Sequence, residues 1–187
     1  MFTRRQFLRC ASAWSLLFAG VLSPAGCGYR VAGRGNALPA EWKSIAVPAL
    51  VNRTSRFRIE QRLTEALIRE LLARTAYRVV QDESRADGVL RGEVLSIETS
   101  AVLFDAATGR ATTVLVTVRL NARLTDRASG KVHYLNENFV FREQYEISTG
   151  TGSSADLRSF FEEQEPALGR LARDFAAALV SAVLENF

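Results

Sequence analysis

Apolar and polar residues alternate most regularly between residues 112 and 126. One set of alternate positions is apolar: Val114, Val116, Val118, Leu120, Ala122 and Leu124. The other set is mostly polar, which is typical of a strand with one face buried and the other in water. The polar stretch 126–131 predicts a turn, and residues 132–145 predict a returning strand. The apolar positions of that strand are Leu135, Phe139, Phe141 and Tyr145.

Three shorter apolar runs precede this hairpin, at residues 44–50, 77–80 and 86–100, and each predicts a strand. Pro48 closes the first run, because proline donates no backbone hydrogen bond and is confined to strand ends and edges. In the third run the alternation slips near Gly92. A slip at a glycine predicts a β-bulge at that point.

Two segments show the spacing of an amphipathic helix. In residues 52–75 the apolar stripe consists of Ile59, Leu63, Ala66, Leu67 and Leu71. Candidates for the cap of this helix are Asn52, Thr54 and Ser55. A second helix is expected from Pro166 onwards, since proline suits a first helical turn. Its core-facing positions are Leu168, Leu171, Phe175, Ala178 and Ala182, and Leu157, Phe160 and Phe161 are expected to form a preceding helical turn.

The order of these elements predicts the fold class. A strand, a helix and a second strand between residues 44 and 80 indicate a βαβ unit. The strands that follow are expected to pair in antiparallel fashion. We therefore expect an α/β (α+β) two-layer sandwich, with two helices on one face of a four- to five-stranded, mixed but mostly antiparallel sheet.

The N-terminal segment has a different pattern. Residues 1–26 contain three arginines and no acid, and residues 11–22 form an apolar run that is too short to cross a bilayer. A basic start, a short apolar stretch and a small-residue end are typical of an export signal rather than of a buried helix. "TRRQFLR", residues 3–9, resembles a twin-arginine signal, although an ordinary Sec signal fits equally well.

Cys27 follows this signal directly. Ala25-Gly26-Cys27 resembles the end of a bacterial lipobox, although Pro24 stands where that pattern prefers leucine. The alternative is a free or disulfide-bonded thiol, but Cys10 is the sole other cysteine and would leave with the signal. We expect a signal peptide at 1–26, an acylated tether at 27–43 and one domain at 44–187. Cys27 would carry an N-acyl diacylglycerol, and Gly28 in place of aspartate favours the periplasmic side of the outer membrane.

Charge and candidate chemistry exclude several classes of function. The chain carries a net charge of +4, and loss of the three arginines of the signal would leave +1, so no strongly basic surface indicates a nucleic-acid partner. The one histidine, His133, has no neighbouring cysteine or histidine in metal-ligand spacing. No G-x-S-x-G or P-loop motif is present. We therefore expect neither an enzyme nor a metal or dissociable cofactor, but an anchored binding or assembly module.

Four short motifs resemble a known family. They are "CGY" at 27–29, "IAVPxxxN" at 45–52, "ADGVLxGEV" at 86–94 and "NxxFxFxExY" at 136–145. Their order is similar to that of the lipopolysaccharide-assembly lipoproteins. The resemblance covers nearly all of the chain from Cys27. It implies an outer-membrane lipoprotein that plugs a large lipopolysaccharide-inserting β-barrel, supports assembly of that barrel and helps deliver lipopolysaccharide to the outer leaflet.

The resemblance also implies where lipopolysaccharide binds. Basic residues near the hairpin of the central strands and in the loop before the last helix are implicated in the family. Here the hairpin "LFDAATGRAT" offers Arg110, and the loop 148–156 has no basic residue. Arg119, Arg123 and Lys131 are further candidates for contact with lipid phosphates or with an acidic barrel lumen. The alternative is that these three lie on a plain solvated sheet face.

A second class of function stays open at this stage. Other outer-membrane lipoproteins share the "IAVPxxxN" start, among them subunits of secretion pores and activators of cell-wall synthases. A co-purifying β-barrel would favour the first class, and a self-ring or a peptidoglycan synthase the second.

Overall fold

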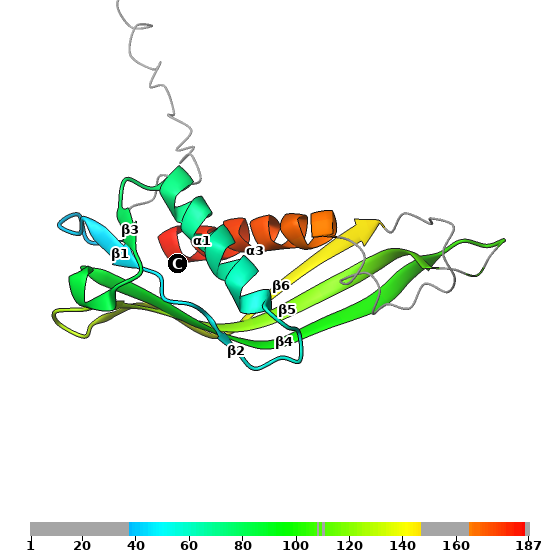
Figure 1. The fold of residues 1–187 in the computed structure, drawn as a ribbon, viewed down its shortest axis with the longest axis horizontal. Helices are drawn as coiled ribbons and strands as arrows, with labels where there is room; N and C mark the ends of the chain where they lie inside the picture. The colour runs from blue at the N-terminus through cyan, green and yellow to red at the C-terminus, as the bar shows by residue number, and fades with distance from the viewer. Residues whose placement is uncertain (1–37, 108, 110, 147–164, 186–187) are drawn as a thin grey trace, which may run out of the picture. The chain divides into compact units, whose positions relative to one another are not determined.

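The computed structural model describes residues 38–107, 109, 111–146 and 165–185. Within them the chain forms six strands, two α-helices and a short 3-10 helix (Figure 1). In chain order these are β1 (Ser44–Ala46), β2 (Val51–Asn52), α1 (Ile59–Arg74), β3 (Arg78–Val80), η1 (Glu83–Arg85), β4 (Gly88–Phe104), β5 (Ala111–Asp126), β6 (Val132–Glu146) and α3 (Glu165–Glu185). The export signal, Cys27, the loop 148–156 and the expected turn around Leu157 lie outside the described residues.

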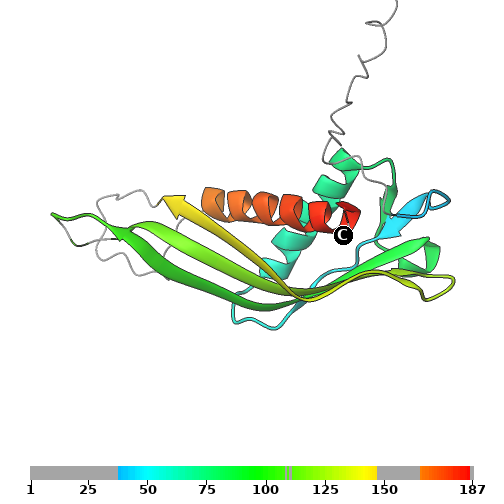
Figure 2. The ribbon, with the colours of Figure 1, turned by 180° about the vertical axis from the view of Figure 1, so that it is seen from behind.

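All six strands belong to one mixed sheet. The strand order is β3-β1-β4-β5-β6, and β2 pairs with β4 beside β1. β1 is parallel to both β3 and β4, whereas β4, β5 and β6 are antiparallel. Figures 1 and 2 show α1 and α3 together on one face of this sheet. The predicted α+β sandwich is confirmed, with one strand more than expected because β2 is two residues long and leaves no periodic pattern.

The structure confirms the predicted alternation on the side of β5 that faces the helices. Every even-numbered residue from Val114 to Leu124 is buried in the main core. The opposite side is less exposed to solvent than expected. Thr117, which lies on that side, is only 9% exposed. Its cross-strand neighbours are Glu98 on β4 and Arg142 on β6, whose long side chains flank the short threonine.

The bulge of β4 lies beyond the position expected from the sequence. The register between β4 and β5 shifts between Val94 and Ser96, not at Gly92. The missing side chain at Gly92 serves packing instead, since a Cβ there would lie 2.6 Å from Leu50 Cδ2. The shift leaves Leu95 exposed and turns both Val94 and Ile97 toward the core.

A second shift changes the faces of β6. Leu120 pairs with Phe139, but Ala122 pairs with Asn136, so β6 holds one extra residue between these two pairs. As a result Leu135, expected among the apolar positions of this strand, lies exposed, whereas Phe141 and Tyr145 are buried.

The two helices close the core. The predicted stripe of α1 is buried throughout. On α3, Leu171 and Phe175 are fully buried, and the ring of Phe175 meets Phe139 and Phe141 edge-on with centroids 6.1 and 5.9 Å away. The other predicted positions of α3, Leu168, Ala178 and Ala182, pack against the core while partly exposed. Pro166 lies in the first turn as predicted.

The predicted cap of α1 is wrong. The helix begins after Arg58, which has a left-handed backbone (φ 58°) and forms no side-chain cap. Asn52 instead organises the loop before the helix. Its Oδ1 accepts a hydrogen bond from Thr54 N (2.8 Å), and its Nδ2 donates to Arg56 O (2.8 Å) and to Glu60 Oε2 (2.9 Å).

Candidate functional site

The outer face of the sheet, which we define as the side of β4, β5 and β6 away from the helices, carries two of the predicted site residues, Arg119 and Arg123. Cross-strand pairing places Arg123 of β5 between Arg91 of β4 and Leu135 of β6. It also places Arg119 between Ser96 and Val140. Since Arg119 and Arg123 are four residues apart on one strand, their Cα atoms are about 13 Å apart.

Ion pairs neutralise much of this face. Arg119 Nε lies 4.0 Å from Glu98 Oε1. Arg91 is paired with Glu83, and Arg53 with Glu93. Exposed pairs of this kind contribute little to stability, but they cancel local charge. The outer face is therefore a row of alternating charges rather than a basic patch.

Arg123 differs from its neighbours. It is exposed, and within the part of the chain that the structure describes it has no salt bridge. It is the predicted cation on this face that is best placed to meet an external anion.

The predicted cations do not form one cluster. Lys131 lies in the turn between β5 and β6, where its carbonyl accepts a hydrogen bond from Asp126 N (2.8 Å). Arg110 lies outside the described residues and precedes Ala111, the first residue of β5. β5 is sixteen residues long, so its two ends are at most about 50 Å apart. The turn that holds Lys131 thus lies at the other end of β5 from Ala111.

The β4–β5 hairpin ends in apolar side chains that the sequence analysis did not single out. Val102, Leu103 and Phe104 are all exposed, Leu103 to 57% and Phe104 to 61%. Figures 1 and 2 show this end of the hairpin extending past the first turn of α3, so that neither of the two described α-helices covers it. Contiguous exposed apolar side chains mark interaction sites in folded proteins. The signal in the sequence was an apolar run that continued past residue 100, where the expected strand ended.

The motif "ADGVLxGEV" behind the resemblance has a structural role. Asp87 Oδ2 accepts hydrogen bonds from Lys43 N (2.8 Å), Ser44 N (2.9 Å) and Ser44 Oγ (2.9 Å), which hold β1 against β4 and lower the pKa of Asp87. Gly88 makes room for the ring of Trp42, since a Cβ there would lie 2.7 Å from Trp42 Cη2. The motif "ADGVLxGEV" is therefore explained by packing and not by ligand chemistry.

The segment expected to be a tether enters the core before β1. Leu38 and Trp42 are both buried. His133 stands against Trp42, with ring centroids 4.9 Å apart at an interplanar angle of 70°. His133 is thus a packing residue next to the β5–β6 turn.

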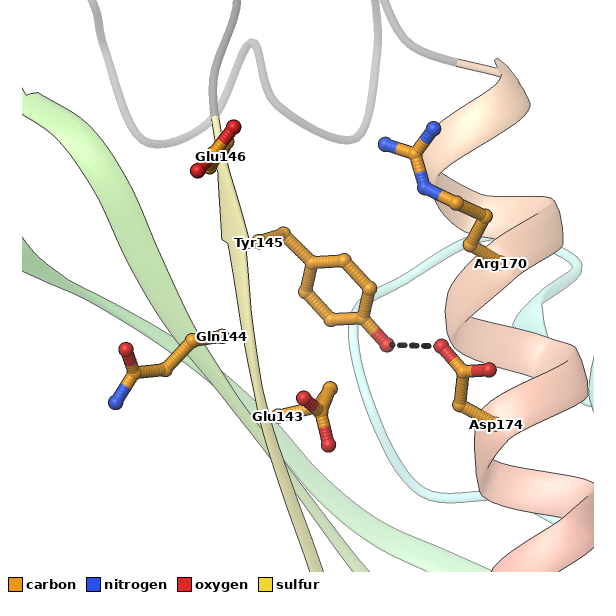
Figure 3. A pocket seen from close by; sticks show the side chains of 6 residues that line it. All are labelled: Glu143, Gln144, Tyr145, Glu146, Arg170 and Asp174. Carbon is orange, nitrogen blue, oxygen red and sulfur yellow. Dashed lines mark hydrogen bonds between the residues drawn. The ribbon is translucent and has the colours of Figure 1, made fainter.

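An open pocket of about 450 Å³ lies between β6 and α3 (Figure 3). Across it, the hydroxyl of Tyr145 donates a hydrogen bond to Asp174 Oδ2 (3.1 Å). Burial raises the pKa of Tyr145, and the negative charge of Asp174 raises it further, so the phenol stays protonated. Figure 3 shows Gln144 on the other side of β6 from this bond. The arrangement ties the edge strand β6 to α3 and offers no activated nucleophile.

No three histidine, cysteine, aspartate or glutamate side chains of the part of the chain that the structure describes gather closely enough to hold a metal ion. Neither described helix has both the length and the apolar content needed to span a membrane.

Solved structures with a similar arrangement share little sequence with the chain. A hypothetical protein from Chlamydia trachomatis is 11% identical, with 77% of this chain and 98% of that chain covered and a TM-score of 0.48. Rare lipoprotein B from Shewanella oneidensis is 14% identical (75% and 92% covered, TM-score 0.42). Lipoprotein B from Nitrosomonas europaea is 16% identical (85% and 96% covered, TM-score 0.39).

Among curated proteins, none matches the chain at a significant level. The family model of the lipopolysaccharide-assembly proteins (LptE), in contrast, matches residues 42–183. This range runs from Trp42, at the entry to the core, to the last buried turn of α3, and so spans the whole described sheet and both helices. The family agrees with the resemblance drawn from the four short motifs, and the chain belongs to the lipopolysaccharide-assembly (LptE) family.

Proposed function

We propose that the protein is a non-enzymatic outer-membrane lipoprotein, held on the periplasmic side by acylated Cys27. In this role it plugs the lipopolysaccharide-inserting β-barrel, supports assembly of that barrel and helps deliver lipopolysaccharide to the outer leaflet. The family membership supports the assembly role. The observation that carries the contact with lipid is the exposed apolar end of the β4–β5 hairpin.

The chemistry of this end suits a lipid with several acyl chains. Side chains at Val102, Leu103 and Phe104 present apolar surface to solvent at the free end of a long hairpin. Burying one such side chain against an acyl chain is favourable by about 1.5–3 kcal/mol. Lipopolysaccharide also carries phosphates, and Arg110 follows the hairpin turn in the sequence. Acyl chains would meet the apolar residues while the phosphate groups meet this arginine.

The outer face supports the contact with the barrel. A plug must present polar surface to a lumen while its own core stays closed. The helices cover the other side of the sheet, so the row of paired charges on β4 and β5 is free to face the barrel wall. Within that row, Arg123 is the cation that we assign to an acidic group of the lumen, and Lys131 adds a second at the turn.

A double substitution tests the contact with lipid. Leu103→Ser with Phe104→Ser removes apolar surface from side chains that are already exposed, so the fold is expected to persist. We expect the affinity for lipopolysaccharide to fall by at least about tenfold, since about 1.4 kcal/mol of lost burial suffices for that change. Capture of the barrel from detergent-solubilised outer membrane should be unchanged.

The matched control is Leu72→Ser on α1, a similarly exposed leucine (55%) outside the hairpin. This variant should bind lipopolysaccharide like the wild type. Equal affinities for all three proteins would show that the hairpin end does not bind the lipid. Failure of the wild-type chain to capture any barrel would contradict the plug role itself.

A further inference from the structure

The loop between β2 and α1 combines an exposed aromatic ring with several cations. Phe57 is 85% exposed, the highest value among the exposed large apolar side chains of the described residues. Between residues 53 and 62 the chain has four arginines and one glutamate. These arginines are Arg53, Arg56, Arg58 and Arg62. We call residues 53–58 the basic-aromatic loop.

The backbone of this loop holds the ring outside the core. Arg58 has φ 58°, the one positive value among the described residues other than glycine. For a residue with a Cβ this conformation is strained and persists where the surroundings impose it. The hydrogen bonds of Asn52 to Thr54, Arg56 and Glu60 impose it here by closing the loop ahead of the helix. Ile59 then turns into the core, while Phe57 remains outside it.

The ring and the cation are arranged as a pair. The guanidinium carbon of Arg58 lies 4.9 Å from the centroid of the Phe57 ring. A cation–π contact of this kind keeps both groups at the surface without burying either. The neighbouring Arg53 is held to Glu93 on the outer face, which anchors the loop to β4. The loop therefore presents an aromatic ring with the guanidinium of Arg58 beside it, while Arg53 is held to Glu93.

We propose that the basic-aromatic loop docks on an anionic phospholipid bilayer, with Phe57 at the boundary between headgroups and acyl chains and the guanidinium of Arg58 on the phosphates. Guanidinium groups bind phosphate oxygens through paired hydrogen bonds, and aromatic rings favour the membrane interface. The chain length permits this contact. Ten residues lie between Cys27 and Leu38, the first described residue, and the chain from Cys27 to Leu38 spans at most about 40 Å.

This docking goes beyond the barrel and lipopolysaccharide roles and uses a different part of the surface. A lipid anchor and a basic patch are two separate membrane signals, and together they bind more durably than either alone. The loop would also fix the orientation of the domain relative to the bilayer, which an acyl tether by itself does not do.

A tryptophan at position 57 tests the proposal. The full chain, isolated from membranes, is reconstituted with vesicles of phosphatidylcholine and phosphatidylglycerol that carry brominated acyl chains. In the Phe57→Trp variant we expect a blue-shifted emission and quenching by bromine, relative to the wild-type chain with its own Trp42. The matched control is Leu72→Trp on α1, which should not be quenched. Arg58→Gly in the Phe57→Trp chain should lose part of the quenching, and because glycine suits φ 58°, its fold should be retained.

Each outcome decides the proposal. Quenching at position 57 but not at 72, with a dependence on phosphatidylglycerol, supports it. Absence of quenching at 57 in floated vesicles overturns it, as does equal quenching at both positions. A shift at 57 that requires added barrel protein also overturns it and assigns the loop to the barrel. Failure of the anchor is distinguished by flotation, since a chain without any membrane contact would not float.

Discussion

The indole of Trp42 donates a 3.1 Å hydrogen bond from Nε1 to Asp126 Oδ2, across 84 residues of sequence. It joins the entry of the chain into the core with the last residue of β5. Asp126 also accepts a bond from Ser129 N (2.7 Å) in the β5–β6 turn. These bonds, those of Ser129 first, lower the pKa of Asp126 from 3.8 to about 2. One carboxylate thus fastens both the N-terminal segment and the turn.

The first prediction concerns the stability of the fold at low pH. Because the pKa of Asp126 is lower in the folded chain, its ionised form stabilises the fold. That contribution is fully present above about pH 5 and is lost as the pH falls toward about 2. Asp126→Asn keeps a polar group but removes the charge, so the melting temperature should drop at neutral pH and the difference from wild type should shrink in acid. A difference that stays constant from neutral pH to about pH 2.5 would contradict this role.

The second prediction concerns Gly88. An added methyl group would collide with the buried ring of Trp42. Gly88→Ala should lower the free energy of unfolding by about 1–3 kcal/mol, as overpacking in cores does. Gly169→Ala on α3 is the control, because a Cβ there meets one flexible arginine tip at 3.8 Å. It should be neutral or stabilising by up to about 1 kcal/mol. Equal effects in denaturant titrations would show that Trp42 does not fill this space.

The third prediction concerns the two faces of the sheet. Val116 is completely buried beneath the helices. Val116→Asp should cost several kcal/mol or prevent folding, because a charge would be buried without a partner. Ser100 on β4 is exposed, so Ser100→Asp should cost less than about 1 kcal/mol. Thermal unfolding of both variants tests this difference. Similar losses of melting temperature would contradict the assignment of Val116 to the buried face and of Ser100 to the exposed face.

The fourth prediction concerns the outer face. Arg119→Glu with Arg123→Glu places a negative charge beside Glu98 and removes the unpaired cation of Arg123. We expect the far-ultraviolet circular dichroism to stay unchanged and capture of the barrel to weaken. Arg69→Glu on α1, which breaks an exposed pair with Glu65, is the control for altered charge. If the double variant captures the barrel as well as this control does, the outer face is merely solvated.

The sequence predicted those parts of the fold that depend on local periodicity. The strand 112–126 and the stripe of α1 were predicted because one face of each is buried along its whole length, which imposes a regular pattern. β2 was missed since two residues carry no period. The left-handed Arg58 was missed because it depends on the side-chain bonds of Asn52, and no residue type that favours this conformation marks it.

The candidate site was predicted less well, because ion pairs between strands determine which of its charges are neutralised. Arg119 and Glu98 lie on different strands, and the bulge between Val94 and Ser96 sets which residue faces which. The sequence offered Arg119 as a cation without revealing this partner. The exposure of Leu103 and Phe104 likewise depends on where the helices end. Apolar residues in a strand are ordinarily read as core.

Contact of the β4–β5 hairpin end with lipopolysaccharide, made while the protein sits with its barrel, is the core of the proposed function. Its most direct test is a photo-crosslinking amino acid placed at Leu103 in living cells, with the same group at Leu72 as the control. We expect a lipopolysaccharide adduct from position 103, none from position 72, and co-purification of a large outer-membrane β-barrel with both proteins. A chain that yields no lipid adduct at 103 and co-purifies with a ring of its own copies or a peptidoglycan synthase would contradict it.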